Sequence, residues 1–160
     1  MQRGPRTLNG ENDTQVLAAA MAQAWRAPLL VYLSGELGVG KTTLVRHLLH
    51  AFGHQGSVRS PTYNLVEPYA LDIGPVFHFD LYRVEDPEEL ELIGWRDYLA
   101  EAALCLVEWP ERAQPLLPPA DVEVFLQLHG HQRLATVRAE GGQGAAWMQR
   151  LAWPTAELAS

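Results

Sequence analysis

The sequence predicts an α/β fold, because apolar runs with the character of strands alternate with helical patterns along the chain. Two runs, 29–33 and 103–109, are continuously apolar, which is typical of parallel strands buried on both faces. Two pairs of further runs are each joined by a short turn, and each pair predicts an antiparallel hairpin. We therefore expect a three-layer sandwich whose mixed sheet carries antiparallel hairpin additions at its edges.

The first third of the chain predicts a helix, a buried strand and a second helix. Asn12 and Asp13 offer an N-cap, and apolar residues then share one helical face until Pro28 stops the pattern. The strand at 29–33 runs into a glycine-rich turn, and a helix follows over 41–52. This order places a glycine-rich loop between a buried strand and the start of a helix.

The middle of the chain predicts a hairpin, two short helices and the second buried strand. The segments 63–69 and 76–82 are rich in β-branched and aromatic residues, so they can pair as antiparallel strands. A short helix over 86–93 has proline at its first turn, and 95–103 continues as helix. The buried strand at 103–109 follows.

The last part of the chain predicts a second hairpin and a terminal helix. The segments 121–129 and 133–139 alternate between apolar and polar residues, as expected of strands with one wet face. We expect a glycine-rich joint at 141–144 and then a helix around 147–152.

Length and composition favour one domain without a membrane span. The 160 residues fit a single domain, whose main part covers 1–140 and whose segment 141–160 is a joint and short helix of that same domain. No run approaches the roughly 18 apolar residues of a transmembrane helix. Cys105 is the single cysteine, and the N-terminus lacks a secretory signal, so a cytoplasmic location is expected.

The charge disfavours direct, strong binding to nucleic acid. The formal net charge is −7, and Lys41 is the only lysine in the chain. Tight binding to RNA or DNA depends on clustered Lys and Arg side chains that neutralise phosphates, and the arginines here are scattered.

One motif predicts a triphosphate site. Residues 35–42 read Gly-Glu-Leu-Gly-Val-Gly-Lys-Thr, which fits the pattern G-x-x-x-x-G-K-[ST] at every specified position. The glycines let successive amide groups point at phosphate oxygens at a helix N-terminus. Lys41 would supply positive charge to the β- and γ-phosphates, and the Thr42 hydroxyl would ligate magnesium. We expect the side chain of Glu36 to face outward, away from the anion.

Two acids and one short segment are candidates to complete the site. Glu108 ends the most continuous apolar strand, which is a suitable position for a metal-binding carboxylate. Asp80 lies on an alternating strand, on the same face as His78 and Tyr82. In Ser60-Pro61-Thr62, the Thr62 hydroxyl could sense the γ-phosphate or its magnesium as part of a switch, although a simple turn fits the residues equally well.

Several classes of nucleotide-binding protein carry a phosphate loop of this kind. A GTPase is disfavoured because the chain has no Asn-Lys-x-Asp motif for reading guanine. A small-molecule kinase has a similar size, but Arg83, Arg96 and Arg112 are too dispersed to predict a lid. A module that holds ATP without hydrolysing it also remains open.

Five ordered motifs resemble a known family. They are residues 35–43, 60–69, 78–83, 86–90 and 105–111, and their sequences and spacing resemble the bacterial TsaE (YjeE) family. The resemblance covers roughly residues 8 to 139, and five motifs in order are much more specific than the phosphate loop alone.

The resemblance implies a P-loop ATPase of tRNA threonylcarbamoyladenosine biosynthesis. Such a protein binds ATP with Mg²⁺, hydrolyses it slowly, and works with the TsaB and TsaD proteins that modify adenosine 37 of tRNA. The resemblance also implies that its ATP cycle resets the partner complex and does not transfer the carbamoyl group. It would meet tRNA only through those partners, which agrees with the acidic charge, and its acceptor would be water.

The resemblance also implies roles for individual residues. Lys41 binds phosphate, Thr42 and Glu108 hold magnesium, Thr62 belongs to a switch, and Asp80 is a candidate for catalysis or the metal site. Further residues border the nucleotide, and they are Glu11, Gly35, Leu37, Gly38, Val39, Gly40, Thr43 and Arg133.

Overall fold

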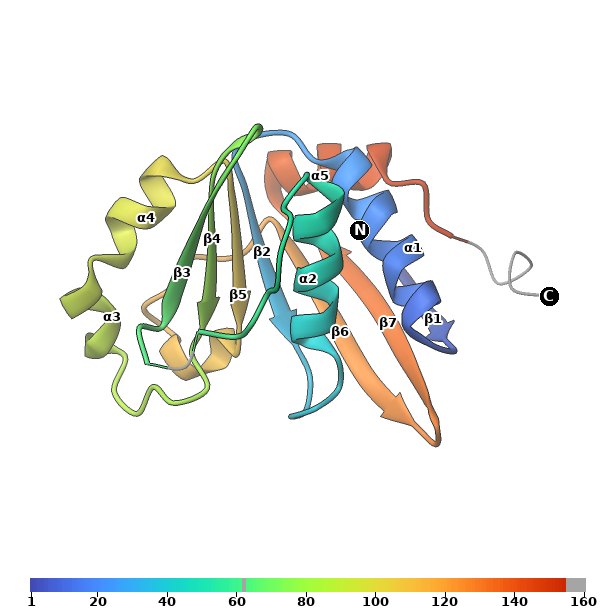
Figure 1. Ribbon diagram of the computed structural model, residues 1–160, viewed down its shortest axis with the longest axis horizontal. Helices are drawn as coiled ribbons and strands as arrows, with labels where there is room; N and C mark the ends of the chain where they lie inside the picture. Colours follow the sequence, from blue (N-terminus) through green and yellow to red (C-terminus); the bar gives the residue numbers. More distant parts are fainter. Residues whose placement is uncertain (62, 155–160) are drawn as a thin grey trace.

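A seven-stranded mixed sheet runs through the middle of the molecule (Figure 1). The computed structural model describes residues 1–61 and 63–154. The strands are β1 (Gln2–Leu8), β2 (Leu29–Ser34), β3 (Val66–Leu71), β4 (Gly74–Asp80), β5 (Leu104–Glu108), β6 (Val122–His129) and β7 (Gln132–Ala139). The helices are α1 (Glu11–Ala24), α2 (Lys41–Ala51), α3 (Glu88–Ile93), α4 (Trp95–Glu101), the 3₁₀ turn η1 (Pro110–Ala113) and α5 (Gly141–Arg150).

The strand order is β1-β7-β6-β2-β5-β4-β3, with a parallel centre and antiparallel edges. β2 pairs in parallel with both β5 and β6, and β4 pairs in parallel with β5. The hairpins β3–β4 and β6–β7 bring the antiparallel strands to the two sides. The predicted mixed α/β sheet with hairpin additions is confirmed.

Helices cover both faces of the sheet, which gives the three layers (Figure 1). On one face, Leu17 of α1, Leu44 of α2 and Trp147 of α5 belong to one apolar core. On the other face, Leu90 of α3 and Trp95 of α4 belong to a second core. The parallel strands between these layers are almost entirely buried, which explains why β2 and β5 are continuously apolar in sequence.

The sheet register sets the place of the candidate site. Because β2, β4 and β5 are parallel, their carboxyl ends meet at one edge of the sheet. Asp80, the last residue of β4, is directly opposite Glu108, the last residue of β5, and Leu33 of β2 is opposite Glu108 on its other side. Ligands of open α/β sheets bind at this kind of edge.

Three elements differ from the sequence-based expectation. The N-terminal strand β1 is not predicted from the sequence, yet it pairs with β7 along the sheet edge. The N-cap of α1 is Gly10, so the expected cap at Asn12 and Asp13 was wrong. Helix α5 begins at Gly141, and its first turn replaces the expected joint at 141–144.

Within the described residues, no helix combines the length and the apolar composition that crossing a bilayer requires.

Candidate functional site

The loop between β2 and α2 is pressed against a neighbouring strand at its first glycine. A Cβ atom built on Gly35 would lie 2.4 Å from the backbone oxygen of Leu126 on β6 and 2.8 Å from Cγ1 of Val39. Only glycine therefore allows the loop to turn this close to the sheet. Val39 is buried, whereas Glu36 and Leu37 are exposed, so the outward direction expected for Glu36 is confirmed.

Lys41 follows this loop as the first residue of α2 and is 5% exposed. Its Nζ donates a hydrogen bond to the backbone oxygen of Gly35 and lies 3.6 Å from the centre of the Trp109 ring. Burial lowers the pKa of Lys41 below its ordinary value, and the negative charges of Glu108, Glu111 and Asp80 oppose that shift. The ammonium group is thus partly desolvated and is held by a carbonyl oxygen and an aromatic face.

Trp109 reaches Lys41 through an unusual backbone turn. Its φ of 58° lies in the left-handed region, which non-glycine residues seldom adopt. The turn follows the end of β5 directly, and the ring also contacts Tyr82, with 5.0 Å between ring centres. No pattern in the sequence predicts that the Trp109 ring lies over Lys41.

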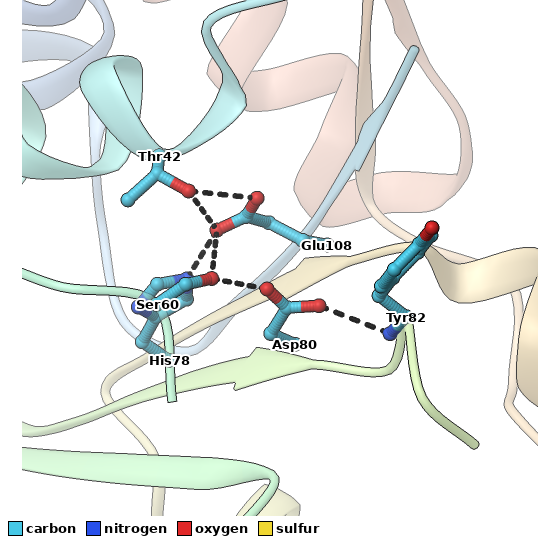
Figure 2. A network of polar contacts seen from close by, with 6 residues as sticks. All are labelled: Thr42, Ser60, His78, Asp80, Tyr82 and Glu108. Atoms are coloured by element: carbon cyan, nitrogen blue, oxygen red, sulfur yellow. Dashed lines mark hydrogen bonds and ion pairs between the residues drawn. The ribbon is translucent and has the colours of Figure 1, made fainter. Parts of the chain in front are cut away.

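The two predicted acids meet beside the start of α2 (Figure 2). The Thr42 hydroxyl lies 3.1 Å from Oε1 and 3.0 Å from Oε2 of Glu108. Asp80 accepts a hydrogen bond from the Ser60 hydroxyl at Oδ2 and from the backbone N–H of Tyr82 at Oδ1, the latter at 3.0 Å. Ser60 Oγ also lies 3.4 Å from Glu108 Oε2, so one serine touches both carboxylates.

A buried histidine completes this network from inside the sheet. His78 on β4 is fully buried, and its Nε2 lies 2.6 Å from Oε2 of Glu108. Glu108 is itself only 2% exposed. The sequence placed His78 on the same face as Asp80, but it assigned no role to the side chain.

Two cavities border the loop. One, of about 290 Å³, is lined by Leu37, Lys41, Thr42, Ser60, Asp80, Glu108 and Trp109, among others. The other, of about 230 Å³, contains Glu11, Val39 and Arg133. Gly38, Gly40 and Thr43 line both. Apart from Gly35, which begins the loop, the described residues that the sequence placed around the nucleotide line one or both of these cavities.

Glu11 and Arg133 lie in the second cavity, away from the two acids at the sheet edge. Glu11 accepts hydrogen bonds from Arg46 and from His47 Nε2, the latter at 3.0 Å, and these bonds lower the pKa of its carboxyl. Arg133 Nε donates to the backbone oxygen of Val39 at 2.6 Å and so fixes the loop from β7. A nucleotide whose phosphates occupied the first cavity could extend its nucleoside into the second.

The oxygen donors of the first cavity suit magnesium that arrives with a triphosphate. Among the described residues, no group of three or more His, Cys, Asp or Glu side chains could hold a metal by itself. Mg²⁺ in phosphate-transfer sites takes one or two protein oxygens and completes its shell with phosphate oxygens and water. Thr42, Glu108 and Asp80 offer such donors. Thr62 lies outside the described residues, and its switch role stays a prediction.

Comparisons with known proteins agree with this architecture. The family model for "Threonylcarbamoyl adenosine biosynthesis protein TsaE" matches residues 8–135. A Haemophilus influenzae protein named tRNA threonylcarbamoyladenosine biosynthesis protein TsaE is 48% identical over 116 residues, which is 72% of this chain and 73% of that protein. A protein of the same name from Bacillus subtilis is 32% identical over 139 residues, 86% of each chain.

A solved structure has the same fold. The crystal structure of Bacillus subtilis YdiB matches with a TM-score of 0.81 and 22% identity, and the match covers 95% of both chains. Since the family model spans residues 8–135 and the relatives align over most of their length, the chain belongs to the TsaE family of threonylcarbamoyl adenosine biosynthesis proteins, P-loop proteins of the ATPase type.

Proposed function

We propose that this chain is a magnesium-dependent ATPase of tRNA threonylcarbamoyladenosine biosynthesis. Its ATP cycle acts on a complex of TsaB and TsaD and does not itself transfer the carbamoyl group. The observation that carries the proposal is the convergence of Lys41, Thr42, Asp80 and Glu108 on one cavity beside the phosphate loop. The names of the relatives, which refer to this tRNA modification, support the choice of pathway.

The loop and Lys41 bind the triphosphate. The backbone N–H groups of the loop and of the N-terminus of α2 donate hydrogen bonds to phosphate oxygens. The helix dipole favours the negative charge of these oxygens. Lys41 turns from Gly35 and Trp109 toward the β- and γ-phosphates. That movement exchanges a carbonyl and an aromatic contact for contact with an anion, which is the stronger partner for a desolvated ammonium group.

Thr42 and Glu108 hold the metal, and Asp80 acts on water. Thr42 and Glu108 would hold Mg²⁺, which would supply positive charge to offset the negative charge that develops during phosphoryl transfer. Glu108 is buried and already contacts the Thr42 hydroxyl, which suits a fixed ligand. Asp80 is less buried and faces the same cavity, so its carboxylate orients the attacking water.

The surroundings of the cavity support a protein partner. Leu37 is 67% exposed and Tyr82 is 40% exposed, and both line the cavity that holds the acids. Tyrosine is a typical anchor of protein interfaces, and exposed apolar side chains beside it add to such a surface. TsaB and TsaD bound at this rim would sense the state of the nucleotide, and tRNA would be met only through them.

The test is a measurement of phosphate release by this chain alone and together with TsaB and TsaD. We expect slow, Mg²⁺-dependent release by the chain alone and a faster rate when both partners are present. A Lys41→Ala variant controls for contaminating ATPases. An unchanged rate with both partners would overturn the partner-dependent part of the proposal, and phosphate found on a small-molecule acceptor would indicate a kinase instead.

A further inference from the structure

The carboxylate of Glu108 depends on a donor that the phosphate loop does not supply. Glu108 and Asp80 end adjacent parallel strands in direct register, so two carboxylates lie side by side. Two neighbouring carboxylates repel each other when both are charged, so each carboxylate needs its own hydrogen-bond donors to keep its orientation. Within residues 1–61 and 63–154, Ser60 is the side chain that contacts both carboxylates, and it has a single hydroxyl proton.

The Ser60 hydroxyl donates its hydrogen bond mainly to Asp80. Its hydroxyl is in close hydrogen-bond contact with Asp80 Oδ2, whereas its distance to Glu108 Oε2 is 3.4 Å. The contact of His78 Nε2 with the same Oε2 is much shorter, at 2.6 Å. The Thr42 hydroxyl lies 3.0 Å from this oxygen, so among the described residues His78 makes its shortest contact (Figure 2).

The surroundings of His78 place its ring proton on Nε2, the nitrogen that contacts Glu108. Within residues 1–61 and 63–154, Nδ1 of His78 is buried and has no hydrogen-bond partner. A proton on Nδ1 would be buried without an acceptor, whereas a proton on Nε2 meets the carboxylate. The ring is fully buried on β4, two register pairs before Asp80 and Glu108, so it cannot turn out to solvent.

We propose that His78 is a positioning residue for Glu108. It anchors Oε2 from inside the sheet, and this holds the carboxylate where the Thr42 hydroxyl contacts both of its oxygens, so that the carboxylate faces the magnesium of the nucleotide. The inference rests on the proposed function, because it concerns how the protein prepares a carboxylate for that ion. Partners of this kind, which orient a metal-binding side chain without touching the metal, commonly affect metal affinity strongly.

The test compares nucleotide binding with and without magnesium. The variant His78→Leu fills the same space without a donor, and His78→Gln keeps an amide donor at nearly the same reach as Nε2. The variant Phe79→Leu is the matched control, because Phe79 is buried on the same strand but belongs to the core on the other face of the sheet. Calorimetry then gives the Kd of ADP in excess Mg²⁺ and in EDTA for each protein.

We expect His78→Leu to lose about tenfold or more of the gain in affinity that Mg²⁺ confers, while its Kd in EDTA stays close to that of the wild type. In hydrolysis, the Mg²⁺ concentration for half-maximal rate should rise more than kcat falls. His78→Gln should recover most of the Mg²⁺ effect. If His78→Leu does not fold, His78→Asn replaces it, since its shorter amide does not reach Glu108 and the same loss is expected.

Three results would overturn the inference. An unchanged Mg²⁺ effect in a folded variant without the donor would show that Glu108 needs no anchor. An equal loss in Phe79→Leu would assign the effect to packing of β4. A wild-type protein that gains no affinity from Mg²⁺ would overturn the proposed function and this inference together, whereas the first two results affect the inference alone.

Discussion

The close packing of the phosphate loop against β6 can be tested by adding a single methyl group at Gly35. In Gly35→Ala, the new Cβ would lie 2.4 Å from the Leu126 backbone oxygen, well below the 3.0 Å that real Cβ atoms respect. That oxygen belongs to β6, which pairs with β2 on one side and β7 on the other. The sheet therefore resists the shift, and the loop has to move.

The expected loss in the free energy of unfolding of Gly35→Ala is the sum of two costs. Overpacking of a tight site costs about 1–3 kcal/mol, and a positive φ for a residue with a Cβ costs about 1–2 kcal/mol. A total of about 3 kcal/mol lowers the Tm of a domain of this size by about 6–12 °C. Gly38→Ala is the control, because Gly38 also has a positive φ, of 79°, but no atom lies within 4 Å of the added Cβ.

Thermal unfolding followed by circular dichroism measures the difference. Gly38→Ala pays only the cost of its backbone conformation, about 1–2 kcal/mol, or roughly 2–8 °C. Equal losses of Tm in the two variants would refute the conclusion that β6 presses on the loop at Gly35. A Gly35→Ala protein as stable as the wild type would refute it more strongly.

Three further predictions follow from the site. In Glu108→Gln, the loss of a negative charge lowers the pKa of Lys41 further, so ATP affinity measured in EDTA should begin to fall at a lower pH than in the wild type, because only the charged lysine attracts phosphate. In Trp109→Leu, loss of a cation–π contact worth about 0.5–2 kcal/mol frees Lys41, and the Kd for ATP in EDTA, measured by calorimetry, should fall by about 2- to 30-fold; a weaker affinity would contradict this. Burial raises the pKa of Cys105, so thiol reagents should label it only at the rate of unfolding, and rapid labelling of the native protein would be the opposing result.

Local patterns predicted the centre of the sheet better than its edge. β2 and β5 are buried on both faces, and their continuous apolar runs record that burial directly. β1 contains Gly4 and Pro5 and two arginines, Arg3 and Arg6, so neither alternation nor composition marks it as a strand. It pairs on one side only, where proline is tolerated, and this pairing depends on β7, which lies more than a hundred residues later.

The start of α5 was missed because a glycine run has two physical meanings. The run at 141–144 was interpreted as conformational freedom and therefore as a joint. In the fold, a Cβ on Gly144 would lie 2.2 Å from the backbone oxygen of Asp121, so that glycine permits a close approach of helix and sheet. A local pattern cannot separate these two uses, because the crowding atom comes from another segment.

The candidate site was predictable where each residue belongs to a motif. Lys41 and Thr42 follow from the loop pattern, Glu108 from the end of an apolar strand and Asp80 from an alternating strand. The fold brings all four to one cavity. His78 and Ser60 were harder to assign, since their importance lies in contacts with Glu108 and Asp80 across strands. Alternation along β4 indicated the correct face for His78 but not the identity of its partner.

The most direct test of the central claim is sustained tRNA modification in a reconstituted reaction. Threonylcarbamoyladenosine formation is followed over many turnovers with TsaB, TsaD and either the wild-type chain or Glu108→Ala, after ATP binding by the variant has been verified. We predict that the wild type sustains product formation with ATP, and that Glu108→Ala stops after the first turnovers because it binds ATP without hydrolysing it. Equal product formation by the two proteins would contradict a role for the hydrolytic cycle.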